Sequence, residues 1–453
     1  MKTNRLAAMA AAVLIAAAAF GWPAGAGAEE AKNTMQSFEG SWDGHISYMG
    51  QKIAIALRLI EDAQGWRGRM DIPPQKAFNL PLTDIRETDG MLRATLPGAT
   101  PMVLQFTLKD STLTGRFTQG PAAGDFSAVR SGDGETLRAQ LKAEAAAEAA
   151  AADPSIISAD VSVAVPGGRL SGTLSRPAGA MADTAILIIP GSGPTDRDGN
   201  SILLPGKNDS LLQLGNALVK KGHMVLRADK RGIGKSVWPG LREEDMTIDM
   251  MADDAAAWLS FLRGQGGIKK AAVIGHSEGA LVALLAARTA ASQASPSALV
   301  LLTPLSADFF ETLFKQLAGA PEEYQKRARH IYEELRAGRY VAEVKNDQMA
   351  LFRPSVQPYL RSLIVHRPGA LLAAQKIPAL VVAGGRDLQI ELADAQALAA
   401  VRPDVRFLFL NDMNHVLKTV GPELSDNQAS YSQPTYPLAE GLVSGIADFL
   451  LGD

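Results

Sequence analysis

Residues 269–287 read KKAAVIGHSEGALVALLAA and decide how the rest of this 453-residue chain is interpreted. The apolar run 271–274 stops at Gly275, and leucines and small residues at helical spacing begin at Ala280. This pattern predicts a buried strand, a very tight turn and a helix packed closely behind it. Gly275 and Gly279 would let strand and helix approach without Cβ clashes. Ser277 would then lie at the apex of the turn, with its hydroxyl beyond the end of the strand.

The five residues Gly275–Gly279 fit the pattern G-x-S-x-G, which is typical of a nucleophile elbow. A serine nucleophile needs a base that takes its proton, a group that orients this base, and donors for the oxyanion. The elbow therefore predicts that such partners follow other strands of the same sheet.

Strands and helices alternate on both sides of the elbow. After a hairpin at 161–174, apolar runs predict buried strands at 185–189, 224–228, 271–274, 299–302, 379–383 and 405–410. Helical patterns lie at 211–221, 247–262, 280–291, 392–400 and 436–451. Such alternation predicts a mainly parallel sheet with helices on both faces.

The alternation breaks between residues 306 and 377, where aromatic residues recur in helical patterns with exposed charge. An insertion after one strand and before the next would lie over the strand ends that carry Ser277. We interpret it as a helical cap that shapes the substrate pocket. A purely structural helical insertion is the alternative.

The candidate bases are the histidines of the chain: His45, His223, His276, His330, His366 and His415. His415 follows the last strand, in the loop 411–415, where sites of open parallel sheets collect. His276 is next to the serine and should point elsewhere as a packed residue. His330 and His366 lie in the cap and could line the pocket. We predict His415 as the base.

The remaining two histidines fit the role less well. His223 begins a strand at its N-terminal end, away from the site. His45 belongs to a different part of the chain, described below.

The orienting acid should also follow a strand. Strand 379–383 runs into Gly384, Gly385 and then Asp387, which we predict as the acid. Asp412, three residues before the histidine, is the rival. Choosing Asp387 places serine, acid and base on successive strand ends.

Strand 185–189 runs into the loop 190–194, PGSGP, whose small residues would let backbone N–H groups face a ligand. We predict an oxyanion hole from the N–H groups of Ser192 and of Glu278, which follows the nucleophile. Gly193 is an alternative donor in this loop.

The ordered set PGSGP, DKRGIGKS (229–236), GHSEG, GGRD and NH resembles the α/β-hydrolase superfamily, and most of all its bacterial carboxylesterase and serine-aminopeptidase-like branch with an extra N-terminal domain. The resemblance covers about 161–451 and implies Ser277, Asp387 and His415 as a catalytic triad. It further implies that Asp229 and Arg231 brace the oxyanion loop.

This loop departs from the family at one position, and a charged run follows it. Pro190 stands where the family often has histidine, which changes how the loop is held. For the charged run 196–198 we favour a solvated turn over contact with substrate.

Residues 33–130 alternate in period two, with turn residues between short runs, and predict a small antiparallel β domain, either a sandwich or a barrel. Its opening Gly-x-Trp and its meander resemble lipocalin-type barrels. Residues 131–155 are rich in Ala and Glu and predict a semi-rigid helical linker. Residues 156–453 would then form the α/β-hydrolase domain.

Residues 1–28 combine a basic start, a short apolar core and a small-x-small exit, which predicts a secretory signal peptide cut after Ala28. The apolar run is short for a membrane anchor, which is the alternative. We therefore expect a periplasmic or secreted protein without a stable membrane anchor. The chain has no cysteine, which excludes disulfides and thiolate metal sites.

These observations predict an exported serine hydrolase that cleaves small-molecule carboxylic esters and needs no metal or organic cofactor. The formal net charge of −3 and the lack of a long basic run argue against nucleic acid as a partner. A peptidase or amidase with the same triad, and a binding protein with an idle hydrolase fold, remain alternatives. The sequence does not predict the acyl length or the oligomeric state.

Overall fold

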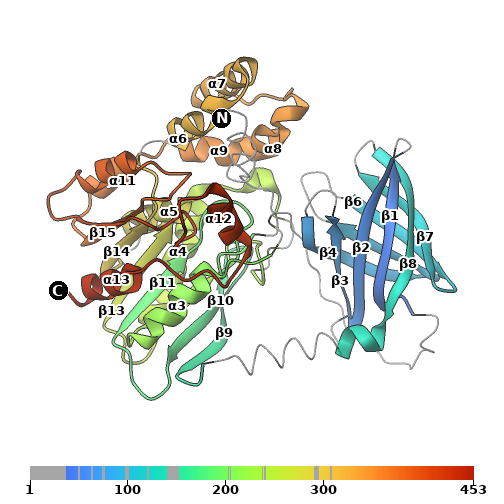
Figure 1. Cartoon of the computed structure of the whole chain (residues 1–453), viewed down its shortest axis with the longest axis horizontal. Coiled ribbons are helices and arrows are strands. Elements are labelled where there is room, and N and C mark those ends of the chain that lie inside the picture. Colours follow the sequence, from blue (N-terminus) through green and yellow to red (C-terminus); the bar gives the residue numbers. More distant parts are fainter. Residues whose placement is uncertain are drawn as a thin grey trace.

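The computed structural model of the protein describes residues 37–139 and 153–452, apart from short gaps at 49–50, 63–64, 74–76, 97–101, 120–121, 202–203, 205, 237, 239–240, 290–294 and 307–308. The predicted signal peptide and most of the predicted linker lie outside the described residues. The described strands form a closed barrel and a separate eight-stranded sheet (Figure 1).

The barrel is an antiparallel meander in which each strand pairs with the next, and the last pairs with the first. Its strands are β1 Gly40–Tyr48, β2 Gln51–Asp62, β3 Gly65–Ile72, β4 Ala77–Thr88, β5 Met91–Leu96, β6 Met102–Lys109, β7 Thr112–Gln119 and β8 Ala122–Asp133. The predicted antiparallel β architecture is therefore present as a closed barrel, and closure leaves no strand edge unpaired.

Side chains fill the inside of the barrel. Every second residue of its strands points inward, and Trp42, Leu57 and Leu104 have no exposed surface. The Phe106 and Phe126 rings stack at 5.1 Å between centroids. This interior is a packed hydrophobic core.

Strand β4 is absent from the strands that the sequence pattern predicts. Its alternation is interrupted by Pro81 and by Asp84, whose φ is 47°. The pairing register with β5 also shifts between Thr83 and Arg86. At such a bulge, successive side chains no longer alternate between the two faces of the strand. The sequence therefore loses the alternation of apolar and polar residues that predicts a strand.

The second sheet has the strand order β16-β15-β14-β13-β11-β12-β10-β9. Six adjacent strands are parallel, from β16 to β12, and β10 is antiparallel to both of its neighbours. The bounds are β9 Ile156–Val165, β10 Gly168–Pro177, β11 Thr184–Ile189, β12 Met224–Ala228, β13 Lys270–His276, β14 Ala298–Leu302, β15 Ala379–Gly384 and β16 Arg406–Leu410.

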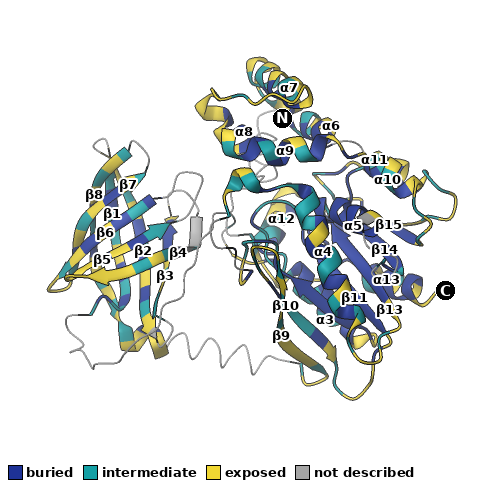
Figure 2. Ribbon diagram, turned by 180° about the vertical axis from the view of Figure 1, so that it is seen from behind, coloured by how far each residue is buried: buried dark blue, intermediate teal, exposed yellow. Residues whose placement is uncertain are grey.

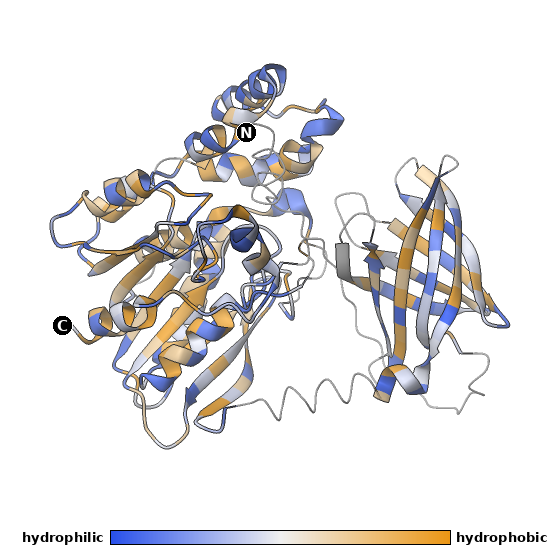
Figure 3. Cartoon of the chain, viewed as in Figure 1, coloured by the Kyte–Doolittle hydropathy of each residue, from blue (hydrophilic) through white to orange (hydrophobic). Residues whose placement is uncertain are grey.

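Helices cover both faces of this sheet because its central strands are apolar on both sides (Figures 2 and 3). Leu187 and Val273 belong to the core beneath α4 Ile248–Arg263, α5 Glu278–Thr289, α10 Pro368–Ala373 and α11 Leu392–Ala399. Ile186 and Ile274 belong to the opposite core, beneath α3 Ser210–Lys220 and α13 Leu442–Leu451. Consecutive residues of one strand thus enter different cores, as the pleat requires.

The insertion between β14 and β15 is helical, and Figure 1 shows its larger helices together beyond one end of the sheet. Besides α10 it contains α6 Phe309–Gln316, α7 Glu322–Arg336, α8 Met349–Phe352 and α9 Gln357–Ile364. It also contains the short 3₁₀ turns η4 Leu317–Gly319, η5 Asn346–Gln348 and η6 Pro354–Val356; a further such turn, η3 Glu243–Asp245, precedes α4. Among the helices of the described residues, none is long and apolar enough to cross a membrane.

The last predicted helix is too long by six residues. It begins at Leu442 and not at Tyr436, because Pro437 cannot donate and Gly441 takes a left-handed φ of 84° just before the first turn. Residues 436–441 instead lie beside the segment that follows β16, and the Ala439 N–H donates to the Leu417 carbonyl of that segment. Two unpredicted short helices, α12 Leu424–Ala429 and η7 Ser430–Ser432, precede this segment.

Candidate active site

Ser277 lies at the apex of a strained turn between β13 and α5. Its φ is 54°, in the left-handed region that non-glycine residues rarely adopt. Its N–H donates to the Leu302 carbonyl of β14 over 2.9 Å, which ties the turn to the sheet. The side chain is half-buried. Strain held in place by the surrounding sheet is typical of functional positions.

The two glycines of the elbow are sterically required. A Cβ at Gly275 would lie 2.2 Å from the Gly279 carbonyl oxygen, and one at Gly279 would lie 2.5 Å from the Ile189 carbonyl oxygen. Strand β13, helix α5 and strand β11 therefore meet at backbone contact distance directly beneath Ser277. The elbow can be this tight only because both positions lack a side chain.

Asp387 and His415 contact each other at the ends of β15 and β16. His415 Nδ1 lies 2.9 Å from Asp387 Oδ2 and 3.1 Å from Oδ1. The Asp387 carboxylate also accepts the N–H groups of Gln389 and Ile390, over 2.8 and 3.0 Å. The two side chains are only 2% and 6% exposed, so the pair is shielded from solvent. An Nδ1–H donated to a carboxylate leaves Nε2 of the imidazole as the basic nitrogen.

A buried asparagine shapes the loop that carries His415. Asn414 is fully buried; its amide donates to Ser430 Oγ over 2.7 Å, and its Oδ1 accepts the Lys418 N–H over 3.0 Å. The side chains that bind the Asn414 side chain lie in α12 and in the turn after it, two elements that the sequence pattern does not predict. These contacts fix the backbone immediately before His415.

His276 links the base to the elbow. Its Nε2 lies 2.7 Å from the His415 carbonyl oxygen, and the two rings are 5.1 Å apart between centroids. Burial lowers the pKa of His276 to about 4, so the ring is neutral at pH 7 and Nε2 must carry the proton that it donates. His276 therefore holds the backbone of His415 beside the residue that precedes Ser277, in agreement with the packed role expected for it.

The structure does not bring the rival acid to the base. The Asp412 side chain is 56% exposed and faces Arg386, while Asn411 donates to it over 2.8 Å. The cap histidines are also elsewhere: His330 is exposed on α7, and His366 faces Asp249 at 3.1 Å. His223 is buried at the start of β12, and His45 lies in the barrel.

The oxyanion loop lies against the nucleophile. A Cβ built on Gly191 would be 3.3 Å from the Cβ of Ser277. Thr195 Oγ1 donates to the Ser192 carbonyl over 2.7 Å. In the described turns and loops, the N–H groups of Ser192 and Glu278 donate to no backbone carbonyl, as an oxyanion hole requires.

The charged run 196–198 is not a solvated turn, so the expectation for it is wrong. Arg197 is 7% exposed, and its guanidinium lies 2.6 Å from Asp229 Oδ2. Asp229 Oδ1 also accepts the Arg197 N–H over 3.0 Å. Arg231 forms a bidentate pair with Asp254 at 2.6 and 3.0 Å. Buried ion pairs thus fix the segment that follows the loop 190–194 and the start of the loop after β12, because each charge has a fixed partner.

A cavity of about 40 Å³ beside this loop contains charged side chains that the sequence pattern does not single out. Lys230 and Glu278 line it together with Gly193 and with Tyr359 of α9. Glu278 is 3% exposed, and its Oε2 has no hydrogen-bond partner among the described residues. Burial raises the pKa of Glu278 and lowers the pKa of Lys230 to about 8.

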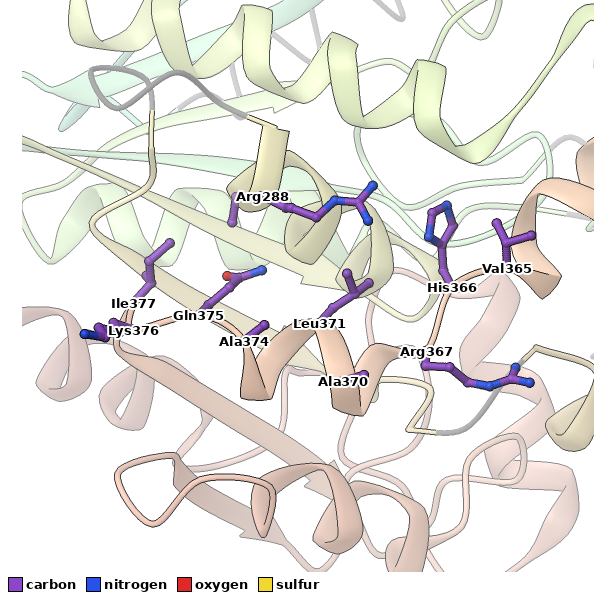
Figure 4. A pocket seen from close by; sticks show the side chains of 11 residues that line it. Arg288, Val365, His366, Arg367, Ala370, Leu371, Ala374, Gln375, Lys376 and Ile377 are labelled. Atoms are coloured by element: carbon purple, nitrogen blue, oxygen red, sulfur yellow. The ribbon is translucent and has the colours of Figure 1, made fainter.

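A larger surface groove, of about 540 Å³, lies elsewhere on the molecule (Figure 4). It is lined by residues from 287–288 and 365–377, among them Arg288 and His366, and includes none of the three predicted catalytic residues. The described residues contain no group of three or more His, Asp or Glu side chains arranged to hold a metal ion.

The segment that carries this arrangement is similar to known proteins. Residues 202–418, which include Ser277, Asp387 and His415, match the family described as serine aminopeptidase, S33. The esterase EstD of Thermotoga maritima is 25% identical over 257 residues, which are 55% of this chain and 58% of EstD. The chain thus matches somewhat more than half of the length of that relative.

Two solved structures are similar at a lower level. Est1E from Butyrivibrio proteoclasticus with bound ferulic acid has a TM-score of 0.42 and 18% identity, covering 64% of this chain and 98% of Est1E. A thermophilic esterase from Thermogutta terrifontis has a TM-score of 0.40 and 21% identity, covering 65% of this chain and 98% of the esterase.

Proposed function

We propose that residues 156–453 form an α/β-hydrolase domain of the esterase and serine-aminopeptidase branch, and that this domain hydrolyses carboxylic esters of small molecules through an acyl-enzyme intermediate. The match of residues 202–418 to the serine aminopeptidase, S33, family and the similarity to the esterase EstD support this proposal. Ser277 is the nucleophile, His415 the general base and acid, and Asp387 the residue that orients the imidazole. The N–H groups of Ser192 and Glu278 form the oxyanion hole.

The proposed reaction has two halves. Ser277 Oγ attacks the acyl carbonyl while His415 Nε2 takes its proton, and the oxyanion of the tetrahedral intermediate accepts the two N–H groups. The imidazolium then protonates the leaving alkoxide, and an alcohol departs. Water, deprotonated by His415, attacks the acyl-enzyme and releases the carboxylic acid and free Ser277.

The observation that carries this proposal is the buried Asp387–His415 pair, held by His276 beside an elbow whose serine has a φ of 54°. Each element of this arrangement costs free energy on its own. A serine at positive φ is strained, and two buried polar side chains must be desolvated. A serine hydrolase requires these groups at one end of one sheet. A purely structural role would not explain why they lie together there.

The proposal is tested with a short-chain p-nitrophenyl ester. The purified protein should hydrolyse it, and Ser277→Ala should lower kcat by at least about 10⁴-fold because no nucleophile remains. Circular dichroism of the variant checks that the fold is kept. Full activity of Ser277→Ala would refute the proposed mechanism, and an inactive wild-type protein would refute the proposed esterase activity.

A peptidase or amidase is the second candidate, and the description of the matched family favours its consideration. The same triad attacks esters and amides, and they differ chiefly in the leaving group that His415 must protonate. Turnover of p-nitrophenyl acyl esters should exceed that of aminoacyl and peptidyl anilides. A clear preference for the anilides would contradict the proposed esterase activity and support a peptidase.

We further propose that the protein is exported, because residues 1–28 have the charge, apolar core and small-residue exit of a signal peptide. The mature chain should begin at Glu29 and appear in the periplasm or the medium. Mass spectrometry of the processed protein after cell fractionation tests this, and a cytoplasmic protein that retains residues 1–28 would contradict it.

A further inference from the structure

Lys230 is the cavity residue that touches the oxyanion loop directly. It follows β12, and its Nζ donates to the Gly191 carbonyl over 2.6 Å and also to the Gly193 carbonyl. One ammonium group thus binds the loop on both sides of Ser192. A side-chain donor that binds a loop carbonyl restricts the orientation of the peptide plane to which that carbonyl belongs.

The geometry of a peptide gives this contact a consequence for the site. Gly191 C=O and Ser192 N–H belong to the same peptide group, which is planar and trans. The carbonyl and the N–H of a trans peptide point in opposite directions. Because the Gly191 carbonyl points toward the Lys230 ammonium, the Ser192 N–H points away from it. The same loop lies beside the elbow, since a Cβ built on Gly191 would be 3.3 Å from the Cβ of Ser277.

We propose that Lys230 is a positioning residue for the oxyanion hole, which keeps the Ser192 N–H aimed at the reacting carbonyl oxygen. The inference rests on the proposed function. The charge of Lys230 also polarises the peptide that it binds, which strengthens the Ser192 N–H as a donor.

The surroundings of Lys230 suit this role. The Glu278 carboxyl favours the charged form of the ammonium, and the Glu278 N–H is the second proposed oxyanion donor. Tyr359 of the cap closes the same cavity and is 5% exposed. Both halves of the oxyanion hole are therefore joined through one buried cluster, which the cap covers.

The test compares Lys230→Met, which keeps the apolar stem and removes the donors, with Lys235→Met as a matched control. Lys235 lies on the same loop, but its ammonium faces Asp160 at 2.5 Å and is 68% exposed. Each protein is assayed for kcat and KM with a short-chain ester. Inhibition is measured with an alkyl trifluoromethyl ketone, whose adduct with serine carries an oxyanion, and with the matching methyl ketone.

We expect Lys230→Met to lower kcat by about 10- to 100-fold, somewhat less than the loss of a complete oxyanion donor, with little change in KM. The inhibition constant of the trifluoromethyl ketone should rise by the same factor, and that of the methyl ketone by less than about threefold. Lys235→Met should change none of these values.

Wild-type kcat retained in Lys230→Met, or equal weakening of both ketones, would overturn the proposal and leave Lys230 a structural residue. If Lys230→Met does not fold, the same comparison with Lys230→Gln decides by the same criteria. These outcomes presuppose hydrolysis by the wild-type protein, so an inactive wild type would count against the proposed function and not against Lys230.

Discussion

His276 shows how one buried side chain can control both stability and activity. Its ring is neutral, donates from Nε2 to the His415 carbonyl, and is linked to Ser277 through the chain. Replacing it by Leu would leave that buried carbonyl without its donor, at a cost of about 1–3 kcal/mol, and would release the backbone of the base. Position 276 therefore supports the catalytic geometry without reacting itself.

The stability of the eight-stranded sheet and its helices should depend on pH through His276. Burial lowers the pKa of its folded-state imidazole from 6.5 to about 4. Between these values the unfolded chain binds more protons, so unfolding becomes easier as the pH falls, by about 3 kcal/mol in total. Above pH 6.5 this contribution is fully present.

Urea unfolding followed by residual activity at pH 7, 5 and 4 checks this. His276→Gln, which keeps a donor but does not titrate, should lose less stability over that range than the wild type. Identical pH dependence of the two proteins would exclude His276 as the source.

Asp387 and Asp412 allow a direct comparison of two carboxylates near one histidine. Asp387→Asn should lower kcat by about 10³- to 10⁴-fold, because an amide in place of the carboxylate favours the wrong tautomer of His415. Asp412→Asn is the control, since this side chain is 56% exposed and faces Arg386. Ester hydrolysis by both purified variants decides between them, and a greater loss in Asp412→Asn would reverse the assignment.

At the scale of elements, the contact between β13 and α5 sets the position of the nucleophile. Gly275→Ala would place a Cβ 2.2 Å from the Gly279 carbonyl oxygen, so strand and helix must move apart. We expect a loss of about 1–3 kcal/mol of stability, as for other overpacked sites, and a fall in kcat, because Ser277 moves with the helix.

Gly266→Ala is the matched control, because nothing lies within 4 Å of a Cβ built there. Thermal unfolding and ester hydrolysis of the two variants test the prediction. Equal effects of the two substitutions would show that the elbow tolerates a side chain.

The sequence predicted those parts of the fold and site that depend on strand ends. Ser277, Asp387 and His415 each follow a buried apolar run, and parallel strands bring such ends to one edge. Their positions were therefore predictable, and the structure places Asp387 against His415. Their catalytic roles stay predictions.

Contacts between a side chain and the backbone, or between charges far apart in the chain, produce no pattern in the sequence comparable to an apolar run. Lys230 acts on two carbonyl groups, which any residue type presents. Arg197 has its partner, Asp229, 32 positions away, so its run resembled a solvated turn. Helix α12 is a six-residue polar segment without an apolar face, although Asn427 and Ser430, within and just after it, hold Asn414.

At the scale of the whole molecule, the barrel and the sheet have separate cores. The buried residues inside the barrel share no member with the two cores on the faces of the eight-stranded sheet. Each core should therefore respond to its own substitutions. This predicts two unfolding transitions in the full-length chain.

Phe126→Ala removes a ring that is 2% exposed inside the barrel and should destabilise that domain by about 3–5 kcal/mol. Ile446→Ala, in the core under α13, should destabilise the eight-stranded sheet and its helices by about 2–5 kcal/mol instead. Calorimetry of the full chain should show a different transition shifted by each variant, with ester hydrolysis at low temperature kept in Phe126→Ala. Joint shifts of both transitions would show that the domains unfold as one unit.

The strand order also has a consequence for the time at which the site comes into existence during synthesis. From β13 onward, β14, β15 and β16 each join the same edge of the growing sheet in the order in which they are translated. Ser277 is in place first, Asp387 follows two strands later, and His415 comes last, with the segment that anchors its loop later still. The proposed nucleophile is thus synthesised long before its proposed base. The proposed hydrolysis therefore requires the complete sheet, and chains that end before β16 should be inactive.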